Sequence, residues 1–258
     1  MAAPDTVHVH VVTPIISDGF RDEAPLHAAA PAGCRLTTTF LANGPASVET
    51  AVDEVLAAPG VIDAALGAQE QGAGAVVIDC MLDPGLDAAR EAVQIPVIGC
   101  GEAAMRDAAA RGDFSIVTVL QSQEPLFHTL AGRYGLAGRL ASVRGIGVPV
   151  LALHDDPDAA TAFTVRESLV ATEHDGAKTV IFGCTGMLGF APRVQEALGV
   201  SARVIDPLPH AVAFAAAAAR RFDPVEQAAG GPPHRKRIAG FVGWPFLDAA
   251  FNSAGASS

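Results

Sequence analysis

The sequence predicts an α/β fold with two pseudo-symmetric three-layer lobes and mainly parallel sheets. Short β-branched apolar runs alternate with alanine-rich stretches at helical spacing, which is typical of βα units around a parallel sheet. Two segments far apart in the chain also repeat the same order of features, which indicates a duplicated lobe. With 258 residues, 50% of them hydrophobic, the chain is long enough to enclose two compact lobes.

The expected elements follow from this alternation. Strands are predicted at residues 7–12, 35–40, 75–80, 96–99, 114–119, 140–143, 179–183 and 203–205. Helices are predicted at residues 48–70, 85–93, 101–111, 122–134, 156–175, 190–198 and 207–221. We place the first lobe at residues 1–105 with part of 205–222, and the second lobe at residues 106–204. Ligands bind beyond the carboxyl ends of such strands, so we expect the active site in the cleft between the lobes.

The internal repeat is centred on two cysteines. Residues 72–99 read GAGAVVIDCMLDPGLDAAREAVQIPVIG and residues 176–206 read GAKTVIFGCTGMLGFAPRVQEALGVSARVID, so Cys80 and Cys184 each lie 8 residues after the first glycine. Each segment then continues with a glycine-containing turn, a helix and a second strand. A single match of this length can also arise because all βα units look alike. We interpret it as a duplication.

Thiols at these two places suit proton transfer. A cysteine at the carboxyl end of a strand lies near the next helix N-terminus and its backbone N–H groups, which are expected to lower the pKa of the thiol toward neutrality. Racemisation at a carbon beside a carbonyl requires a base on one face and an acid on the other. Pseudo-two-fold symmetry would bring Cys80 and Cys184 to one crevice, where nearby N–H groups would stabilise an enolate.

Core packing is the default interpretation of any free cysteine, because cysteine is among the most buried residue types. We keep that interpretation for Cys34 and Cys100 and exempt Cys80 and Cys184 because of their matched positions. The four cysteines contain no C-x-x-C pair, so they predict free thiols and no zinc site.

Composition excludes several classes of partner. The net charge is −11, with 17 Lys and Arg against 28 Asp and Glu, so a nucleic-acid partner is not expected. No apolar run reaches the roughly 18 residues of a membrane-spanning helix, and the first residues lack a signal-peptide pattern. We therefore expect a cytoplasmic protein that does not enter a membrane.

The chain resembles the aspartate/glutamate/hydantoin racemase superfamily over roughly residues 7–220, and most closely its hydantoin and allantoin racemase branch. The resemblance is carried by NGPASVE, VIDCMLDPGLDAARE, IPVIGCGEAAM, FSIVTVL, VPVLAL and VIFGCTGM. It implies two α/β lobes, a site between them, no metal or other cofactor, and Cys80 and Cys184 as the two acid/bases. The implied substrate is a small molecule with a carboxylate, amide or imide group, and we expect a homo-oligomer.

The resemblance also implies a set of substrate-binding positions. Thr185 and Gly186 would offer donors beside the second thiol, whereas Glu102 has an equally good interpretation as an ordinary glutamate in the first turn of a helix. The full predicted set is Thr13, Pro14, Ile15, Ser47, Met81, Glu102, Thr118, Thr185 and Gly186.

One departure from the hydantoin racemase pattern lies at the end of the first strand. Those relatives usually have Asn-Pro-Asn-Thr there, and this chain has Thr13-Pro14-Ile15-Ile16. Isoleucine supplies no hydrogen-bond donor, so the loop predicts a changed contact with the ligand.

Weaker signals favour structural roles. His8 and His10 lie on one face of a strand without a third metal ligand, and His154 precedes two aspartates that suit a helix cap. Strand alternation directs Asp79 away from the face of Cys80, which favours a structural role for it. The GAGA fragment at 72–75 precedes a strand, which is the wrong side for a dinucleotide-binding loop.

Residues 223–258 have the composition of a tail. They contain Gly-Gly, Pro-Pro, a basic HRKR run to which we assign no function, and an apolar stretch IAGFVGWPFLDAAF. We expect the tail to be partly ordered, with the apolar stretch docked on the body or on a neighbouring subunit.

Three functional hypotheses follow. The first is a two-thiol racemase or epimerase acting on a hydantoin, allantoin or related α-amino-acid derivative. The second is a decarboxylase or cis–trans isomerase of the same superfamily, which uses one cysteine. The third is a non-catalytic ligand-binding relative, suggested by the apolar residues near the first strand.

Overall fold

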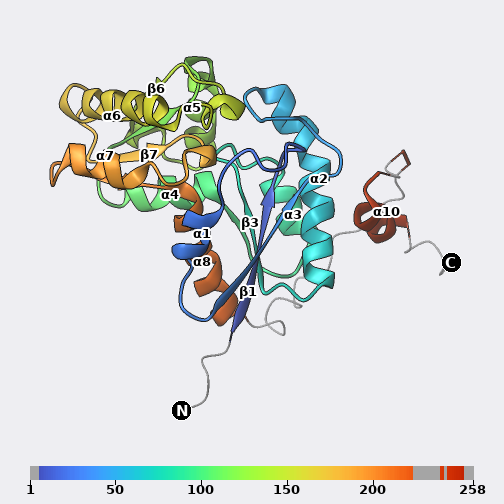
Figure 1. The fold of residues 1–258 in the computed structure, drawn as a ribbon. Coiled ribbons are helices and arrows are strands. Elements are labelled where there is room, and N and C mark those ends of the chain that lie inside the picture. Colours follow the sequence, from blue (N-terminus) through green and yellow to red (C-terminus); the bar gives the residue numbers. More distant parts are fainter. Residues whose placement is uncertain (1–5, 223–238, 241–242, 253–258) are drawn as a thin grey trace, which may run out of the picture.

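The computed structural model describes residues 6–222, 239–240 and 243–252, and it contains two four-stranded parallel sheets, one in each lobe (Figure 1). The first sheet has the order β2-β1-β3-β4. Its strands are β1 (Val7–Thr13), β2 (Cys34–Phe40), β3 (Ala75–Ile78) and β4 (Val97–Gly99). This confirms the predicted α/β fold with two lobes.

The second sheet repeats the arrangement of the first. Its order is β6-β5-β7-β8, with β5 (Phe114–Thr118), β6 (Leu140–Gly145), β7 (Thr179–Phe182) and β8 (Arg203–Ile205). Val12 pairs with Ile78 in the first sheet, and Val117 pairs with Phe182 in the second. The next residues along β1 and β5, Thr13 and Thr118, are therefore equivalent, and each cysteine follows two residues after the equivalent strand end. The register extends the repeat beyond the two cysteine segments.

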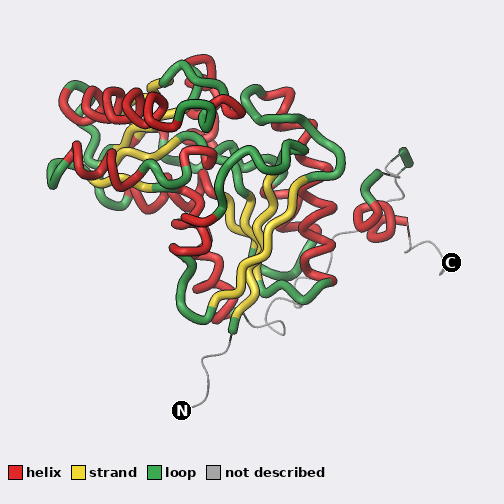
Figure 2. The backbone as a smooth tube through the Cα atoms, viewed as in Figure 1, coloured by secondary structure: helices red, strands yellow, loops and turns green. Residues whose placement is uncertain are grey.

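Helices cover both faces of the first sheet, so that its central strands are buried (Figure 2). Helices α2 and α3 pack together on one face, and α4 and α8 pack together on the other. Although α8 follows the whole second lobe in the sequence, it contacts β1, β3 and β4. The bounds are α1 (Ala24–Ala28), α2 (Ala51–Glu70), α3 (Leu86–Ala92), α4 (Cys100–Ala109) and α8 (Pro207–Arg221).

The second sheet is covered in the same way. Helix α6 packs on β5, β6 and β7 and against α7, while α5 packs against β6. Helix α4 also contacts β5 and β7, so it packs against the sheets of both lobes. These helices are α5 (Glu124–Arg133), α6 (Pro157–Glu173) and α7 (Ala191–Leu198), joined by short 3₁₀ turns at Gln121–Gln123, Ala137–Arg139, Val150–Ala152 and Thr185–Met187.

Burial of the central strands explains their sequence. Every residue of β3, β5 and β7 is buried, which is the reason that these strands are mainly apolar rather than alternating, with Ser115, Thr118 and Thr179 as the polar exceptions. The largest side chains in this core include Phe114, Phe182 and Ile181, all 0% exposed.

Element boundaries differ from the predictions by a few residues, and the causes are local. The helix expected from residue 48 begins at Ala51, because Thr50 accepts a hydrogen bond from the Asp53 amide and the Asp53 carboxylate caps the Thr50 amide in return. Strand β3 ends at Ile78 rather than at Cys80, so Asp79 and Cys80 belong to the loop. The five-residue helix α1 was not predicted.

Part of the C-terminal segment forms a helix, α10 (Pro245–Asn252), that lies on α2. The Asp63 carboxylate accepts a hydrogen bond from the Leu247 amide at 2.7 Å, and Leu247 is buried. A Cβ atom on Gly67 would lie 2.7 Å from the Phe246 ring, so only glycine leaves room for that ring. The HRKR run lies outside the described residues.

Within residues 6–222, 239–240 and 243–252, no helix is long and apolar enough to cross a bilayer. In the same part of the chain, no group of three His, Cys, Asp or Glu side chains is placed to hold a metal ion.

The loop that carries Cys80 is anchored by one aspartate. The Asp83 carboxylate accepts hydrogen bonds from the Gly101 amide at 2.9 Å, the Glu102 amide at 2.7 Å and the Tyr134 hydroxyl at 2.6 Å. Asp83 thus caps the first turn of α4. Its φ of +50° is unusual for a residue with a side chain, so these bonds must offset local strain.

Substitution of Gly101 tests this anchor. A Cβ atom there would lie 2.3 Å from the Met81 carbonyl oxygen, so Gly101→Ala is expected to lower the free energy of unfolding by about 1–3 kcal/mol, measured by urea denaturation. The matched control is Gly132→Ala in α5, where a Cβ atom meets nothing within 4 Å and up to about 1 kcal/mol of stabilisation is expected. An unchanged stability of Gly101→Ala would contradict the close approach.

Candidate active site

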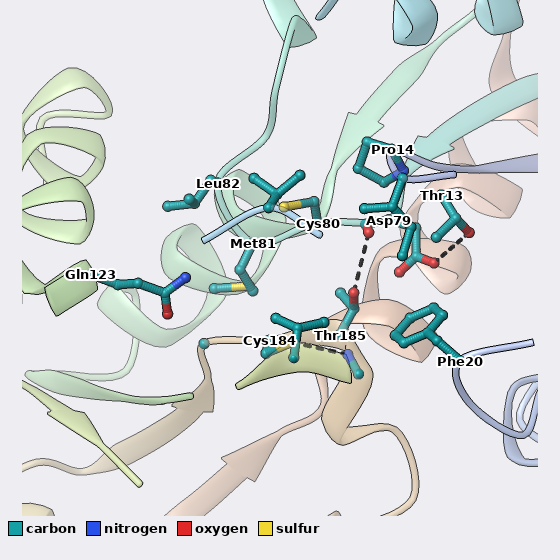
Figure 3. Close-up of a pocket in the computed structure, with 15 residues that line it drawn as sticks. Thr13, Pro14, Phe20, Asp79, Cys80, Met81, Leu82, Gln123, Cys184 and Thr185 are labelled. Carbon is teal, nitrogen blue, oxygen red and sulfur yellow. Dashed lines mark hydrogen bonds between the residues drawn. The ribbon is translucent and has the colours of Figure 1, made fainter. Parts of the chain in front are cut away.

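Both thiols line one cavity between the carboxyl ends of β3 and β7 (Figure 3). About 430 Å³ of space not filled by atoms lies between the lining residues, including the part that opens to solvent. The first lobe contributes Thr13, Pro14, Ile15, Phe20, Val48, Asp79, Cys80, Met81 and Leu82, and the second contributes Gln123, Val150, Gly183, Cys184, Thr185 and Gly186.

Each thiol lies in a tight turn just beyond its strand. The Cys80 amide donates to the Ile78 carbonyl at 3.0 Å, and a backbone N–H of Leu82 faces the Cys80 sulfur. In the second lobe the Gly186 amide donates to the Cys184 sulfur at 3.3 Å. Both cysteines are free and half-buried. An N–H group aimed at each sulfur stabilises a thiolate when one forms.

The expected lowering of the thiol pKa values is wrong for this structure. Burial raises the pKa of Cys80 well above its ordinary value and raises that of Cys184 to about 12. Withdrawal from water outweighs the N–H groups, and the neighbouring Asp79 carboxylate adds to the rise at both thiols. The helix after Cys80 begins only at Leu86, and Cys184 is followed by a single 3₁₀ turn, so neither sulfur lies at an α-helix N-terminus.

Three contacts join the lobes around the cavity. The Thr185 hydroxyl donates to the Asp79 carbonyl at 3.2 Å, and Arg21 Nη1 donates to the Thr185 carbonyl at 3.2 Å. The Glu49 carboxylate accepts a hydrogen bond from the Val150 amide at 2.8 Å. The two cysteine loops are therefore tied to each other directly.

Eight of the residues predicted from sequence come together in this lining. Besides the two cysteines they are Thr13, Pro14, Ile15, Met81, Thr185 and Gly186.

Three others lie outside the lining. Ser47 is absent from it, and its neighbour Val48 lines the cavity instead. Glu102 pairs with Arg90 and Arg106, each at 2.8 Å, in a separate surface depression. Thr118 is fully buried behind the wall, where its hydroxyl donates to Gln123 Oε1 at 2.6 Å.

Gln123 and Phe20 are lining residues that sequence reasoning missed. Gln123 is 2% exposed, and its oxygen is held by Thr118, so its amide nitrogen is the end available to the cavity. A signal existed for Gln123, because it lies in the loop after β5 just as residues 14–15 lie in the equivalent loop after β1. No pattern in the sequence singles out Phe20.

Asp79 combines the expected structural role with a place in the cavity lining. It is 2% exposed, and its carboxylate accepts hydrogen bonds from Thr13 Oγ1 at 2.9 Å and from Arg21 Nη2 at 2.5 Å. Strand alternation does not set the direction of the Asp79 side chain, because β3 ends before Asp79.

Comparison with known proteins shows which family the chain resembles. The sequence model of the family described as Asp/Glu/Hydantoin racemase matches residues 22–215. The chain is 35% identical to a hydantoin racemase of Rhizobium meliloti over 82% of this chain and 88% of that protein. It is 39% identical to a hydantoin racemase of Pseudomonas sp. (strain NS671) over 72% of this chain and 76% of that one.

A solved structure agrees with these matches. The allantoin racemase from Klebsiella pneumoniae superposes with a TM-score of 0.85 at 32% identity, covering 93% of this chain and 98% of that one. The chain belongs to the Asp/Glu/hydantoin racemase family.

The family match includes both cysteine loops but begins after the loop at residues 13–16. That loop is where this racemase-family protein departs from the hydantoin racemase pattern, and it contributes Thr13, Pro14 and Ile15 to the cavity. The departure therefore lies in the wall of the site.

The raised pKa values predict how the thiols react with iodoacetamide. Only a thiolate reacts, and the folded thiols are protonated at neutral pH, so the alkylation rate is expected to rise about tenfold per pH unit from neutral to alkaline pH. In the urea-unfolded chain the rate should level off near the ordinary pKa of about 8.5, whereas the folded protein should continue to climb. Peptide mass spectrometry measures the rate at each cysteine. A rate at Cys80 and Cys184 that already levels off near neutral pH would contradict the expected pH dependence.

Proposed function

We propose that this racemase-family isomerase interconverts the two enantiomers of a hydantoin, allantoin or related α-amino-acid derivative, with Cys80 and Cys184 as its acid and base. The observation that carries the proposal is that the two thiols, one from each lobe, line a single cavity. Family membership supports the class of reaction, and the geometry supports the role of the thiols.

The proposed reaction moves one proton off the substrate and another onto it. The thiolate of one cysteine removes the proton from the carbon beside the carbonyl, and the electron pair of that C–H bond moves into the carbonyl to form an enolate. The other thiol then donates its proton to the opposite face of the same carbon. One cysteine ends protonated and the other ionised, so the reverse direction exchanges their roles. We propose that no cofactor takes part.

Hydrogen-bond donors in the lining support the enolate step. Gln123, with its oxygen held by Thr118, can present its amide nitrogen to a ring carbonyl oxygen. Preorganised donors of this kind are most effective in a cavity withdrawn from water. We propose Gln123 as a substrate-binding residue together with Thr13, Pro14, Ile15, Met81, Thr185 and Gly186.

The apolar wall favours a neutral ring over a free amino acid. Ile15, Phe20, Val48, Leu82 and Val150 all line the cavity. Among its described lining residues the one charged side chain, Asp79, is already bonded to Arg21. The ammonium and carboxylate groups of a free amino acid would lose water there without gaining partners, which is costly. A neutral hydantoin with an apolar 5-substituent has no such cost.

Deuterium exchange in heavy water tests the two-thiol mechanism. Cys80→Ser and Cys184→Ser are each expected to lose about 10²–10⁴-fold in racemisation, because a hydroxyl replaces the acid/base on one face. Each variant retains the thiol on the other face, so each should exchange the α-proton of one enantiomer only, and the two variants should exchange opposite enantiomers. Polarimetry measures the racemisation, and mass measurement of the separated enantiomers measures the exchange of the α-proton.

The control variant is Cys34→Ser, since Cys34 lies at the start of β2 and outside the cavity lining. It should racemise at the unsubstituted rate. Full activity in both cavity variants would end the proposal, and release of carbon dioxide would favour the decarboxylase alternative. Binding of a hydantoin without any exchange would favour the non-catalytic alternative.

Ile15 is expected to set the preference for an apolar substituent. Ile15→Asn should lower kcat/KM for 5-isobutylhydantoin relative to allantoin by about 10–100-fold, because a polar amide replaces an apolar contact. Ile15→Val, which shortens the same side chain by one methyl group, is the control and should keep the preference. The measurement is kcat/KM for both compounds by polarimetry. An unsubstituted protein that prefers allantoin would contradict the assignment of the apolar wall.

A further inference from the structure

Arg21 is a fully buried cation that touches the loop of each thiol. Its Nη2 lies 2.5 Å from Asp79 Oδ2, and its Nη1 lies 3.2 Å from Asp79 Oδ1 and 3.2 Å from the Thr185 carbonyl. Its Nε donates to Glu23 at 2.8 Å. Asp79 directly precedes Cys80, and Thr185 directly follows Cys184. One guanidinium group therefore connects the residues next to both sulfurs.

Stability alone is a poor explanation for this pair. The side chains of Arg21 and Asp79 are both 0% exposed, so each loses its hydration on folding. The attraction between buried opposite charges is largely offset by that loss, and apolar residues of similar size often stabilise a core as well or better. A buried pair placed beside the cavity instead suggests a role in fixing geometry.

The shape of arginine suits such a role. A guanidinium is planar and presents several N–H groups at fixed angles, so it can bind a carboxylate in a bidentate manner and still reach a carbonyl. Thr13 Oγ1 holds the second position on Asp79 Oδ2 at 2.9 Å. The Asp79 side chain is thereby fixed from both sides.

The second lobe has no equivalent of this pair. Gly183 occupies the position of Asp79, and a Cβ atom there would lie 2.4 Å from the Thr118 Cβ. Any side chain at residue 183 would therefore displace Thr118. A single ion pair, contributed entirely by the first lobe, must serve both cysteine loops.

We propose that Arg21 is the positioning residue that sets the spacing of Cys80 and Cys184 across the substrate, by binding the Asp79 carboxylate and the Thr185 carbonyl at once. The inference rests on the proposed two-thiol function and deepens it. The hydrogen bonds of Arg21 reach neither sulfur, so Arg21 acts through the two loops.

The same pair also shapes the electrostatic surroundings of Cys184. The charged or titratable groups facing this thiol are Arg21, Asp79, Glu49 and Cys80, with His154 bonded to the Gly186 carbonyl at 2.9 Å. The Arg21 charge lowers the pKa of Cys184, and the Asp79 charge raises it. Removing Arg21 alone should therefore raise the pKa of Cys184, and removing Asp79 alone should lower it.

The test uses Arg21→Gln, Asp79→Asn and the double variant in the full chain, with Arg193→Gln as the control. Arg193 forms an exposed ion pair with Asp158 between α7 and α6, away from the cavity. Three quantities are measured: the melting temperature, kcat and KM for 5-isobutylhydantoin, and the iodoacetamide alkylation rate of Cys184 at one alkaline pH. The alkylation measurement needs no racemase activity.

Arg21→Gln should lower kcat about 10²-fold, the usual cost of misplacing reacting groups by about 1 Å, with little change in KM. It should also slow alkylation of Cys184, whereas Asp79→Asn should accelerate it. The double variant should regain the melting temperature but not kcat, because neither charge of the Arg21–Asp79 pair is left unpaired and Glu23, whose side chain is 24% exposed, stays in contact with water. Arg193→Gln should leave all three unchanged.

Two results would overturn the inference. One is a double variant that regains kcat together with the melting temperature, because Arg21 would then be only structural. The other is an alkylation rate of Cys184 that is equal in all variants. If the unsubstituted protein shows no racemisation, the proposed function fails, and the alkylation rates still decide whether Arg21 and Asp79 are coupled to Cys184.

Discussion

The site depends on the close approach of the two lobes, which is seen in the hydrogen bond from the Thr185 hydroxyl to the Asp79 carbonyl at 3.2 Å. Parallel sheets deliver their functional loops at the carboxyl ends of their strands, and here the ends of β3 and β7 meet. Without that meeting, each cysteine would lie in the loop of an ordinary βα unit. The repeated lobe arrangement supplies two such loops, and the contact between the lobes turns them into one cavity with a thiol on each side.

The burial that this contact creates has two opposite effects on the chemistry. Withdrawal from water raises the pKa of both thiols, so the fraction present as thiolate at neutral pH is small. A thiolate with a raised pKa is, however, a stronger base toward a weakly acidic carbon. The same withdrawal strengthens the hydrogen bonds that Gln123 and the backbone can offer to an enolate oxygen. Burial thus lowers the amount of thiolate and raises its strength as a base.

Much of the fold and part of the site could be predicted from the sequence, because they depend on local patterns. The central strands are mainly apolar, and the cysteine repeat marks the two equivalent loops, so both the sheets and the thiols were predictable. The placement of Ser47, Glu102 and Thr118 was not, because it depends on the exact direction of side chains beyond strand and helix ends. Arg21 lies in a loop and Gln123 in a short 3₁₀ turn, and the bonds that hold them join residues 2 to 164 positions apart in the chain. The prediction of lowered thiol pKa values failed for a related reason, since neither the exact start of the next helix nor the depth of burial follows from the local sequence pattern.

Divergence between the two halves is as informative as their similarity. Thr13 and Thr118 hold equivalent strand ends, yet the first hydroxyl binds the Asp79 carboxylate, while the second binds Gln123 and, at 3.3 Å, the carbonyl of Gly183. An aspartate at the equivalent position in the second lobe would clash with Thr118, and a second buried carboxylate would also need a second cation. The Arg21–Asp79 pair in the first lobe and Gly183 in the second can therefore be packed together, whereas an aspartate in both lobes could not. The proposed proton transfer calls for two equivalent thiols, but the packing around them requires that their surroundings differ.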